Sequence, residues 1–245
     1  MSKYFTVEVK PTVTASKQHV ASFGQGELIF DWTEFEIPKG SARLVGASII
    51  ARPKGDSAPT ANDNALSLVL SKSNTQTLGD INSAPTNRPT NDLLGVVEFA
   101  ATDYSAAGMA SSVVASSPST IKAPIVITAN QSLASTAGFD KYYIGGITAD
   151  TGTDFRTIIR INDVDIDSAS PGTALVVDGS SMTALEHFLP GDVLHAHDDA
   201  VIGTVDTVNS ATSITLTESI STGVLQDDDY VYNIHPYRII LQFEQ

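Results

Sequence analysis

Apolar and polar residues alternate with a period of two along the chain, in runs separated by clusters of glycine, proline, asparagine and aspartate. This period places successive side chains on opposite faces of a β-strand, and the separating residues favour tight turns. The pattern predicts an all-β protein. The strands expected in the first part of the chain are Lys3–Val9, Glu27–Ile37, Arg43–Arg52, Ala65–Ser71, Leu94–Ala100, Ile125–Ala129 and Tyr142–Ile147.

The run Glu27–Ile37 predicts a strand with two distinct faces. Strict alternation places Leu28, Phe30 and Trp32 on one face and Phe35 on the other. Trp32 is the only tryptophan of the chain. We therefore expect its indole in the core of the first domain.

Charge is distributed unevenly between the two halves of the sequence. Residues 1–125 hold 10 basic and 11 acidic side chains, whereas residues 126–245 hold 4 basic and 17 acidic side chains. A chain of 245 residues has room for one large domain or two small ones. Two interpretations stay open: the acidic loops keep the protein soluble, or the two regions face different surroundings.

The sequence predicts two domains. Residues 1–160 are expected to form a jelly-roll-like β-sandwich, and residues 161–236 a second, acidic domain. Val193–His197, Val201–Val208 and Ser213–Thr217 are separated by four-residue polar turns of the hairpin type. Short strands at this spacing predict a small closed β-barrel of the SH3-like or OB-like kind, and Gly191 and Gly203 suit its tight bends.

The last segment of the chain, residues 237–245, predicts one more strand. Tyr237, Ile239, Leu241 and Phe243 alternate with mostly polar neighbours. A tail with this much β character is expected to return to the sheet of the first domain. The second domain would then be an insertion near the C-terminus.

Several classes of function are disfavoured by composition and by missing motifs. Without cysteine, the chain cannot form disulfides, thiolate metal sites or a thiol nucleophile. A net charge of −14 disfavours direct binding of nucleic acid, because phosphates are neutralised by Lys and Arg. Phosphate-binding glycine loops, a nucleophile elbow and a His-Glu-x-x-His motif are missing from the sequence. We therefore expect a protein that is not an enzyme, with no catalytic residue and no cofactor.

Targeting signals are also missing from the sequence. The first ten residues carry Lys3, Glu8 and Lys10, so that they form no apolar secretory segment. The longest apolar stretch, Leu44–Ala51, is far too short for a membrane helix. We expect synthesis in the cytoplasm and no membrane partner.

Two clusters are candidates for metal binding. Asp163, Asp165 and Asp167 share one face of a possible strand, and three aligned carboxylates suit Ca²⁺, although the EF-hand register fails. His195 and His197 share a strand face and have the chemistry to bind zinc or nickel. The alternative in each case is a solvated surface, and this alternative is favoured, so that no metal site is predicted.

Several segments of the chain resemble virion structural proteins of tailed bacteriophages. The resemblance covers about two thirds of the sequence and consists of β-sandwich patterns with turns. The segments that carry it are Phe30–Gly40, Leu44–Ala51, Leu66–Leu70 with Leu78–Asp80, Pro190–Val193, Ile202–Val205 and Thr212–Thr217.

The resemblance implies a capsid decoration, or cement, protein. Such proteins commonly build a jelly roll or a related β-sandwich, associate as homotrimers and bind the major capsid protein on the outer surface of the head shell. The location implied is the virion, after synthesis in the host cytoplasm. We expect the near-neutral sandwich to contact the shell and the acidic barrel to project outward. The alternatives are a tail or baseplate component and a carbohydrate-binding β-module.

Overall fold

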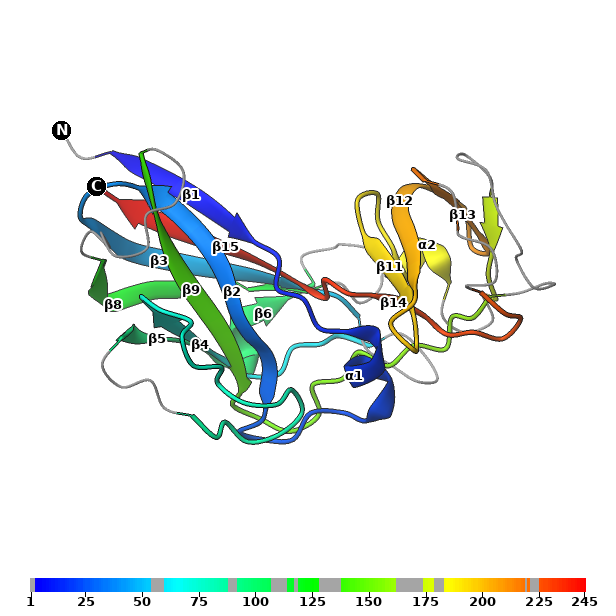
Figure 1. Ribbon diagram of the computed structural model, residues 1–245, viewed down its shortest axis with the longest axis horizontal. Coiled ribbons are helices and arrows are strands. Elements are labelled where there is room, and N and C mark those ends of the chain that lie inside the picture. The colour runs from blue at the N-terminus through cyan, green and yellow to red at the C-terminus, as the bar shows by residue number, and fades with distance from the viewer. Residues whose placement is uncertain are drawn as a thin grey trace.

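A computed structural model describes residues 3–53, 60–87, 92–106, 114–116, 119–127, 138–161, 174–178, 183–218, 220 and 225–245. Strands dominate these residues, which confirms the all-β prediction. Two bodies lie next to each other along the long axis of the molecule (Figure 1). The smaller one, called the C-terminal unit below, comprises the described residues between 159 and 234.

The larger body contains most of the strands. They are β1 (Tyr4–Val9), β2 (Leu28–Pro38), β3 (Ala42–Ala51), β4 (Leu66–Ser71), β5 (Leu93–Phe99), β6 (Tyr104–Ser105), β7 (Val114–Ser116), β8 (Ser119–Ile127), β9 (Phe139–Thr148) and β15 (Tyr237–Glu244). The helix α1 (Ala15–Val20) and the 3-10 turn η1 (Ala101–Asp103) complete it. The expected strands are present with their ends shifted by a few residues, and residues 128 and 129 of the expected strand Ile125–Ala129 lie outside the described residues.

These strands form a jelly roll. One sheet has the order β1-β15-β3-β7-β6, with β8 also paired to β3, and the other has the order β2-β9-β4-β5. β7 and β8 pair with successive parts of β3 and occupy one strand position. With the short β6 left out, the jelly roll then has eight strand positions. The first pairs with the eighth (β1 with β15), the second with the seventh (β2 with β9), the third with the sixth (β3 with β8) and the fourth with the fifth (β4 with β5). Such nested antiparallel pairing over two sheets is the jelly-roll arrangement.

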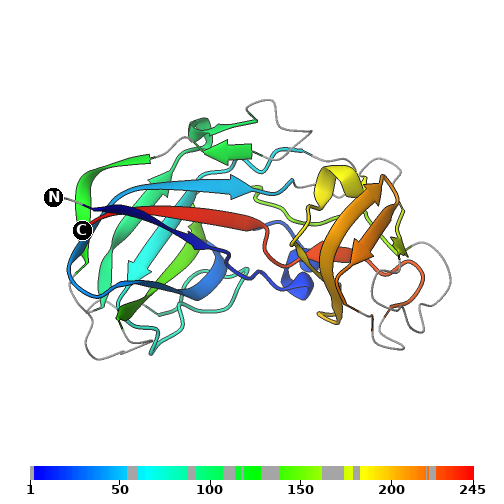
Figure 2. The same cartoon turned by 90° about the horizontal axis from the view of Figure 1, so that it is seen from above.

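The last strand, β15, lies inside the first sheet between β1 and β3. Its burial alternates, and Tyr237, Ile239, Leu241 and Phe243 point into the core. The whole C-terminal unit is thus placed between the seventh and eighth strands of the jelly roll. Both termini lie at the end of the jelly roll that is remote from this unit (Figure 2).

The predicted faces of β2 are wrong beyond Phe30. Register shifts interrupt the pairing of β2 with β9 between Leu28 and Phe30 and again between Phe30 and Thr33. Because each irregularity moves later side chains to the other face, Phe30 and Phe35 are both buried and Trp32 is partly exposed. The indole Nε1 of Trp32 donates a hydrogen bond to the carbonyl oxygen of Gln76, at 2.7 Å.

The C-terminal unit is built on a second, separate sheet. Its elements are β10 (Ala174–Val176), α2 (Ala184–His187), β11 (Val193–Ala196), β12 (Val201–Ser210), β13 (Ser213–Leu216) and β14 (Val231–Asn233). The strand order is β10-β13-β12-β11-β14, and a separate apolar cluster fills the unit. The tight bend predicted at Gly203 is present, where φ is +144° and the ladder between β11 and β12 shifts register.

The predicted closed barrel is not formed by the described residues. The edge strands β10 and β14 are each three residues long and do not pair with each other. Instead, Arg160 bridges to Tyr230 beside β14, and Ile161 bridges to Val177 beside β10. Two single bridges therefore span the gap that a sixth strand would close.

Helix α1 connects the two bodies and was not expected from the sequence. It belongs to the segment between β1 and β2 and contacts β11 and β14 of the C-terminal unit. The chain itself passes between the bodies twice, before Ile159 and after Ile234. In the part of the chain that the structure describes, no helix has the length and apolar character needed to cross a bilayer.

Candidate functional site

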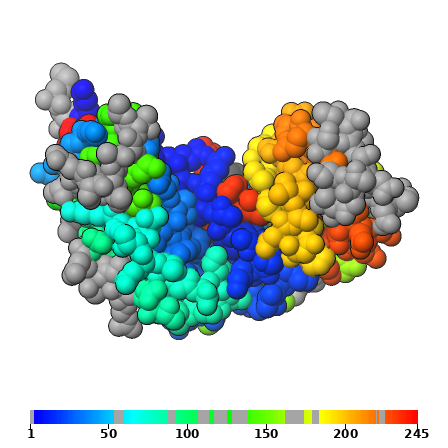
Figure 3. Space-filling view, in the orientation of Figure 1, coloured from blue at the N-terminus to red at the C-terminus, as the bar shows by residue number. Residues whose placement is uncertain are grey.

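A cleft of about 360 Å³ lies where the jelly roll meets the C-terminal unit. The space-filling view shows the molecule hollowed between the two bodies (Figure 3). The cleft is lined by the ends of β1, β3 and β15 nearest the C-terminal unit, and by the loop before β11. Its lining residues are Glu8, Lys10, Ile50, Arg52, Leu189, Pro190, Gly191, Asp192, His235, Tyr237 and Arg238.

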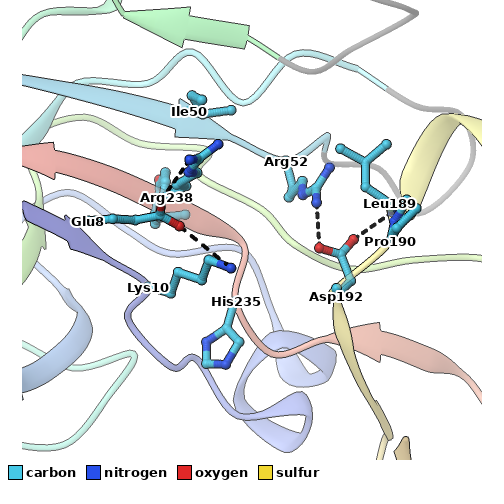
Figure 4. A pocket seen from close by; sticks show the side chains of 11 residues that line it. Glu8, Lys10, Ile50, Arg52, Leu189, Pro190, Asp192, His235 and Arg238 are labelled. Atoms are coloured by element: carbon cyan, nitrogen blue, oxygen red, sulfur yellow. Dashed lines mark hydrogen bonds and ion pairs between the residues drawn. The ribbon is translucent and has the colours of Figure 1, made fainter. Parts of the chain in front are cut away.

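Arg52 and Asp192 form an ion pair across this cleft (Figure 4). Arg52 follows β3 in the jelly roll, and Asp192 precedes β11 in the C-terminal unit. The other carboxylate oxygen of Asp192 accepts a hydrogen bond from the backbone N–H of Leu189, at 2.8 Å. Burial raises the pKa of Asp192, while Arg52 and this N–H favour its charged form.

The carboxylate of Glu8 forms ion pairs with two cationic side chains of the jelly roll. Arg238 Nη2 donates to Glu8 Oε2 at 2.6 Å, and Lys10 Nζ lies 3.6 Å from Glu8 Oε1. The hydrogen bond from Arg238 is the main cause that lowers the pKa of Glu8. Three cationic side chains in the cleft therefore share two carboxylates, those of Glu8 and Asp192.

His235 lies on the segment that leads from β14 to β15. Its Nδ1 is 3.3 Å from the carbonyl oxygen of Pro11, and burial lowers the pKa of its imidazole. The ring is therefore mainly neutral at pH 7. It adds no full charge to the cleft under these conditions.

A second contact between the bodies is made by α1. Ser16 donates two hydrogen bonds to the carboxylate of Asp199, from its backbone N–H at 2.9 Å and from its hydroxyl at 2.6 Å. The amide of Gln18, which is buried, donates to the carbonyl oxygen of Asn233 at 2.9 Å. These bonds dock the helix on the turn between β11 and β12 and on β14.

His19 of α1 lies among the aromatic side chains of the C-terminal unit. Its Nδ1 shares a hydrogen bond of 2.8 Å with the hydroxyl of Tyr232, and its ring lies 5.3 Å from that of His197 and 5.0 Å from that of Tyr230. Burial, and to a lesser degree His197, lower the pKa of His19. Arg160 stacks over the Tyr230 ring at 4.5 Å.

All five histidines of the chain belong to the C-terminal unit or to the segments that join it to the jelly roll. They are His19, His187, His195, His197 and His235. His187 is buried, and burial together with nearby Arg52 lowers its pKa to about 3. The Nδ1 atoms of His187 and His197 have no hydrogen-bond partner among the described residues.

The predicted metal candidates have two different outcomes. Asp163, Asp165 and Asp167 lie outside the described residues. His195 and His197 are not brought together on a shared ligand: His195 Nδ1 bonds to the carbonyl oxygen of Asp199 at 2.9 Å, whereas His197 faces His19. Within the described ranges, no group of three or more His, Asp or Glu side chains is placed to hold a metal ion.

The cleft residues were not identified from the sequence. Arg52 and Asp192 are 140 positions apart, and neither belongs to a short motif. The one available signal was charge: residues 161–236 contain 13 Asp and Glu but no Lys or Arg. An ion pair between a carboxylate of residues 161–236 and a Lys or Arg must therefore take the cation from outside this segment.

A further surface, called the terminal end below, lies at the other end of the jelly roll. Tyr4 begins β1 opposite Glu244, Val126 lies opposite Arg43, and Phe139 begins β9. Their side chains are 71%, 55% and 41% exposed, respectively. Three large apolar side chains are thus presented to solvent close to both termini.

No protein-family model and no curated protein matches the chain. A chain from the "Structure of infectious bursal disease virus Gx strain" aligns with 8% sequence identity and a TM-score of 0.23. The alignment covers 99% of this chain and 40% of that chain.

Proposed function

We propose that the protein is a non-enzymatic structural protein of a virion, a capsid decoration protein that binds the outer surface of the head shell as a homotrimer and stabilises it. The observation that carries the proposal is the difference between the two ends of the molecule. Residues 161–236 hold 13 Asp and Glu and no Lys or Arg, and the C-terminal unit that they form lies opposite the terminal end, where Tyr4, Val126 and Phe139 are exposed. The C-terminal unit also exposes apolar side chains, those of Val176, Leu185, Leu189 and Val201, so that charge is what distinguishes the two ends.

This difference between the ends suits a protein that docks through one of them. Burial of apolar side chains that are exposed in the isolated chain against a partner surface stabilises the complex. The segment of residues 161–236, with 13 carboxylates and no Lys or Arg, in contrast repels nucleic acid and other acidic surfaces. The terminal end therefore faces the shell in our proposal, and the C-terminal unit projects outward.

The jelly roll is compatible with this role, since it recurs in viral capsid domains and also in lectins. A fold alone does not determine function, so that the assignment depends on the surfaces. The sequence resemblance to phage virion proteins supports the same class of function.

Electron microscopy of the native particle tests the proposal directly. We expect trimers on the head shell, with Tyr4, Val126 and Phe139 near the shell and residues 183–218 pointing away from it. Density for the C-terminal unit against the shell would contradict the orientation. Density on the tail or baseplate would assign the alternative virion role, and a particle without this chain would reject the proposal.

A binding assay on shells that lack the protein tests the docking surface. Replacing Tyr4 and Phe139 by Asp should weaken binding by about tenfold or more, because charges enter an apolar contact. Val201→Asp is the matched control, since Val201 is 59% exposed in the C-terminal unit. Equal binding by the control and the double variant would locate the docking surface elsewhere.

A further inference from the structure

The cleft between the two bodies has the features of a second binding surface, separate from the terminal end. It is open to solvent in the space-filling view, and its walls come from three jelly-roll strands and one loop of the C-terminal unit (Figures 3 and 4). It therefore combines side chains that are far apart in the sequence.

The charged groups in the cleft do not balance. Lys10, Arg52 and Arg238 supply three positive charges, whereas Glu8 and Asp192 supply two negative charges. Arg52 is committed to Asp192, so Lys10 and Arg238 share the single carboxylate of Glu8. The local excess is positive, which is opposite in sign to the net charge of −14 of the whole chain.

Lys10 is the cation with the most capacity for another partner. Its Nζ is 3.6 Å from Glu8, and half of its side chain is exposed. Arg238 is held at 2.6 Å from the same carboxylate. A carboxylate that enters the cleft beside Lys10 would complete the pairing of three cations with three anions.

The cleft also offers apolar contact area next to these charges. Leu189 is 48% exposed, Ile50 is partly exposed, and the ring of Pro190 continues the same wall. Such a wall suits aliphatic side chains on either side of a carboxylate. Because the apolar and the cationic groups are adjacent, a peptide fits the cleft better than a small inorganic anion does.

We propose that this cleft binds an extended segment of a partner protein through one Asp or Glu side chain flanked by aliphatic residues. The carboxylate pairs with Lys10 and Arg238, and the aliphatic side chains cover Leu189 and Ile50.

A peptide titration of the full chain tests this proposal. The probe is the blocked pentapeptide acetyl-Ala-Leu-Glu-Leu-Ala-amide, and the control peptide carries Gln in place of Glu. In ¹H–¹⁵N spectra, the Glu peptide should shift the amide signals of Ile50, Gly191 and Arg238 in a saturable manner. The Gln peptide should bind about three- to fivefold more weakly, as expected for the loss of one exposed ion pair.

Matched variants identify the cation. Lys10→Gln should weaken binding of the Glu peptide by about three- to fivefold and leave binding of the Gln peptide unchanged. Lys39→Gln is the control, because Lys39 is exposed in the turn between β2 and β3, remote from the cleft. Both lysines are exposed, so both variants should fold, which circular dichroism checks.

Three results would overturn the proposal. The first is equal binding of the Glu and Gln peptides, and the second is no binding at the highest soluble concentration. The third is self-association that Lys10→Gln abolishes, since the occupant would then be a second copy of this chain. Particle microscopy separates these outcomes from the proposed function: a decorated shell with an empty cleft leaves the virion role intact.

Discussion

Arg52 Nη2 lies 2.5 Å from Asp192 Oδ1, and this ion pair joins the jelly roll to the C-terminal unit. The side chains are 14% and 9% exposed, so that the pair is largely shielded from water. A carboxylate in such a position is stable only while its partner is present. The buried carboxylate of Asp192 therefore depends on a cation that the jelly roll supplies, in addition to the contacts that α1 makes with the C-terminal unit.

Arg52→Leu should destabilise the protein by about 3 kcal/mol, because it leaves the buried carboxylate of Asp192 without its cation. Denaturant unfolding at pH 7 measures the change. Arg238→Leu is the control: its ion pair with Glu8 is half exposed, and its loss should cost less than about 1 kcal/mol. Similar losses for both variants would show that the Arg52 pair is no more important than a surface pair.

Acid should weaken the fold through His187. Its pKa is about 3 in the folded protein and about 6.5 in the unfolded chain, so that the unfolded state alone gains the proton between these values. Stability from this group is complete above pH 6.5 and falls by about 1.4 kcal/mol per pH unit as the pH decreases. At pH 5 the loss should be roughly 2 kcal/mol.

His187→Leu separates this contribution from that of the carboxylates. The variant should lose less stability between pH 7 and pH 5 than the parent protein, as measured by urea unfolding at each pH. His195→Gln, at a partly exposed position, is the control and should keep the acid sensitivity. An unchanged pH profile of His187→Leu would mean that the buried ring is not the source.

Gly146→Ala should destabilise the jelly roll by about 1–3 kcal/mol, because the added methyl group enters a tightly packed core. A Cβ at Gly146 would overlap the ring of Phe30, which is fully buried. Thermal unfolding measures the effect. The double variant with Phe30→Leu should lose less than the sum of the two single variants, because the smaller side chain makes room. Strict additivity would contradict this contact.

Removing residues 237–245 should abolish the folded jelly roll. The deletion takes away β15, with four buried side chains and the hydrogen bonds to both β1 and β3. Circular dichroism and a thermal melt measure the outcome. Deletion of Gln245 alone is the control and should leave the melt nearly unchanged, since Gln245 is exposed. A cooperative melt of the long deletion would show that the sheet tolerates the loss of its central strand.

The strands were largely predictable from the sequence because their signal is local. The alternation from Tyr237 to Phe243 indicates the strand and its buried face directly, and both are present. Irregular positions carry no such signal. Trp32 leaves the core because of the irregular pairing of β2 with β9, a strand that lies more than a hundred residues further along the chain.

Helix α1 and the open sheet of the C-terminal unit show a second limit of the sequence. A helix of six residues is not stable alone, and α1 depends on the contacts of Ser16 and Gln18 with the C-terminal unit. Closure of a barrel similarly depends on whether edge strands reach each other, which strand count and turn spacing do not determine. The cleft depends on both features, so that it was accessible only from the three-dimensional arrangement.

The place of β15 in the first sheet also dictates the order in which the chain can fold during synthesis. The C-terminal unit is formed by neighbouring segments and is complete once residue 234 has left the ribosome. β1, by contrast, has no sheet partner in the described structure until the last strand has emerged. β1 must therefore wait for β15, and release of the chain before β15 is made would leave the edges of β1 and β3 exposed to aggregation.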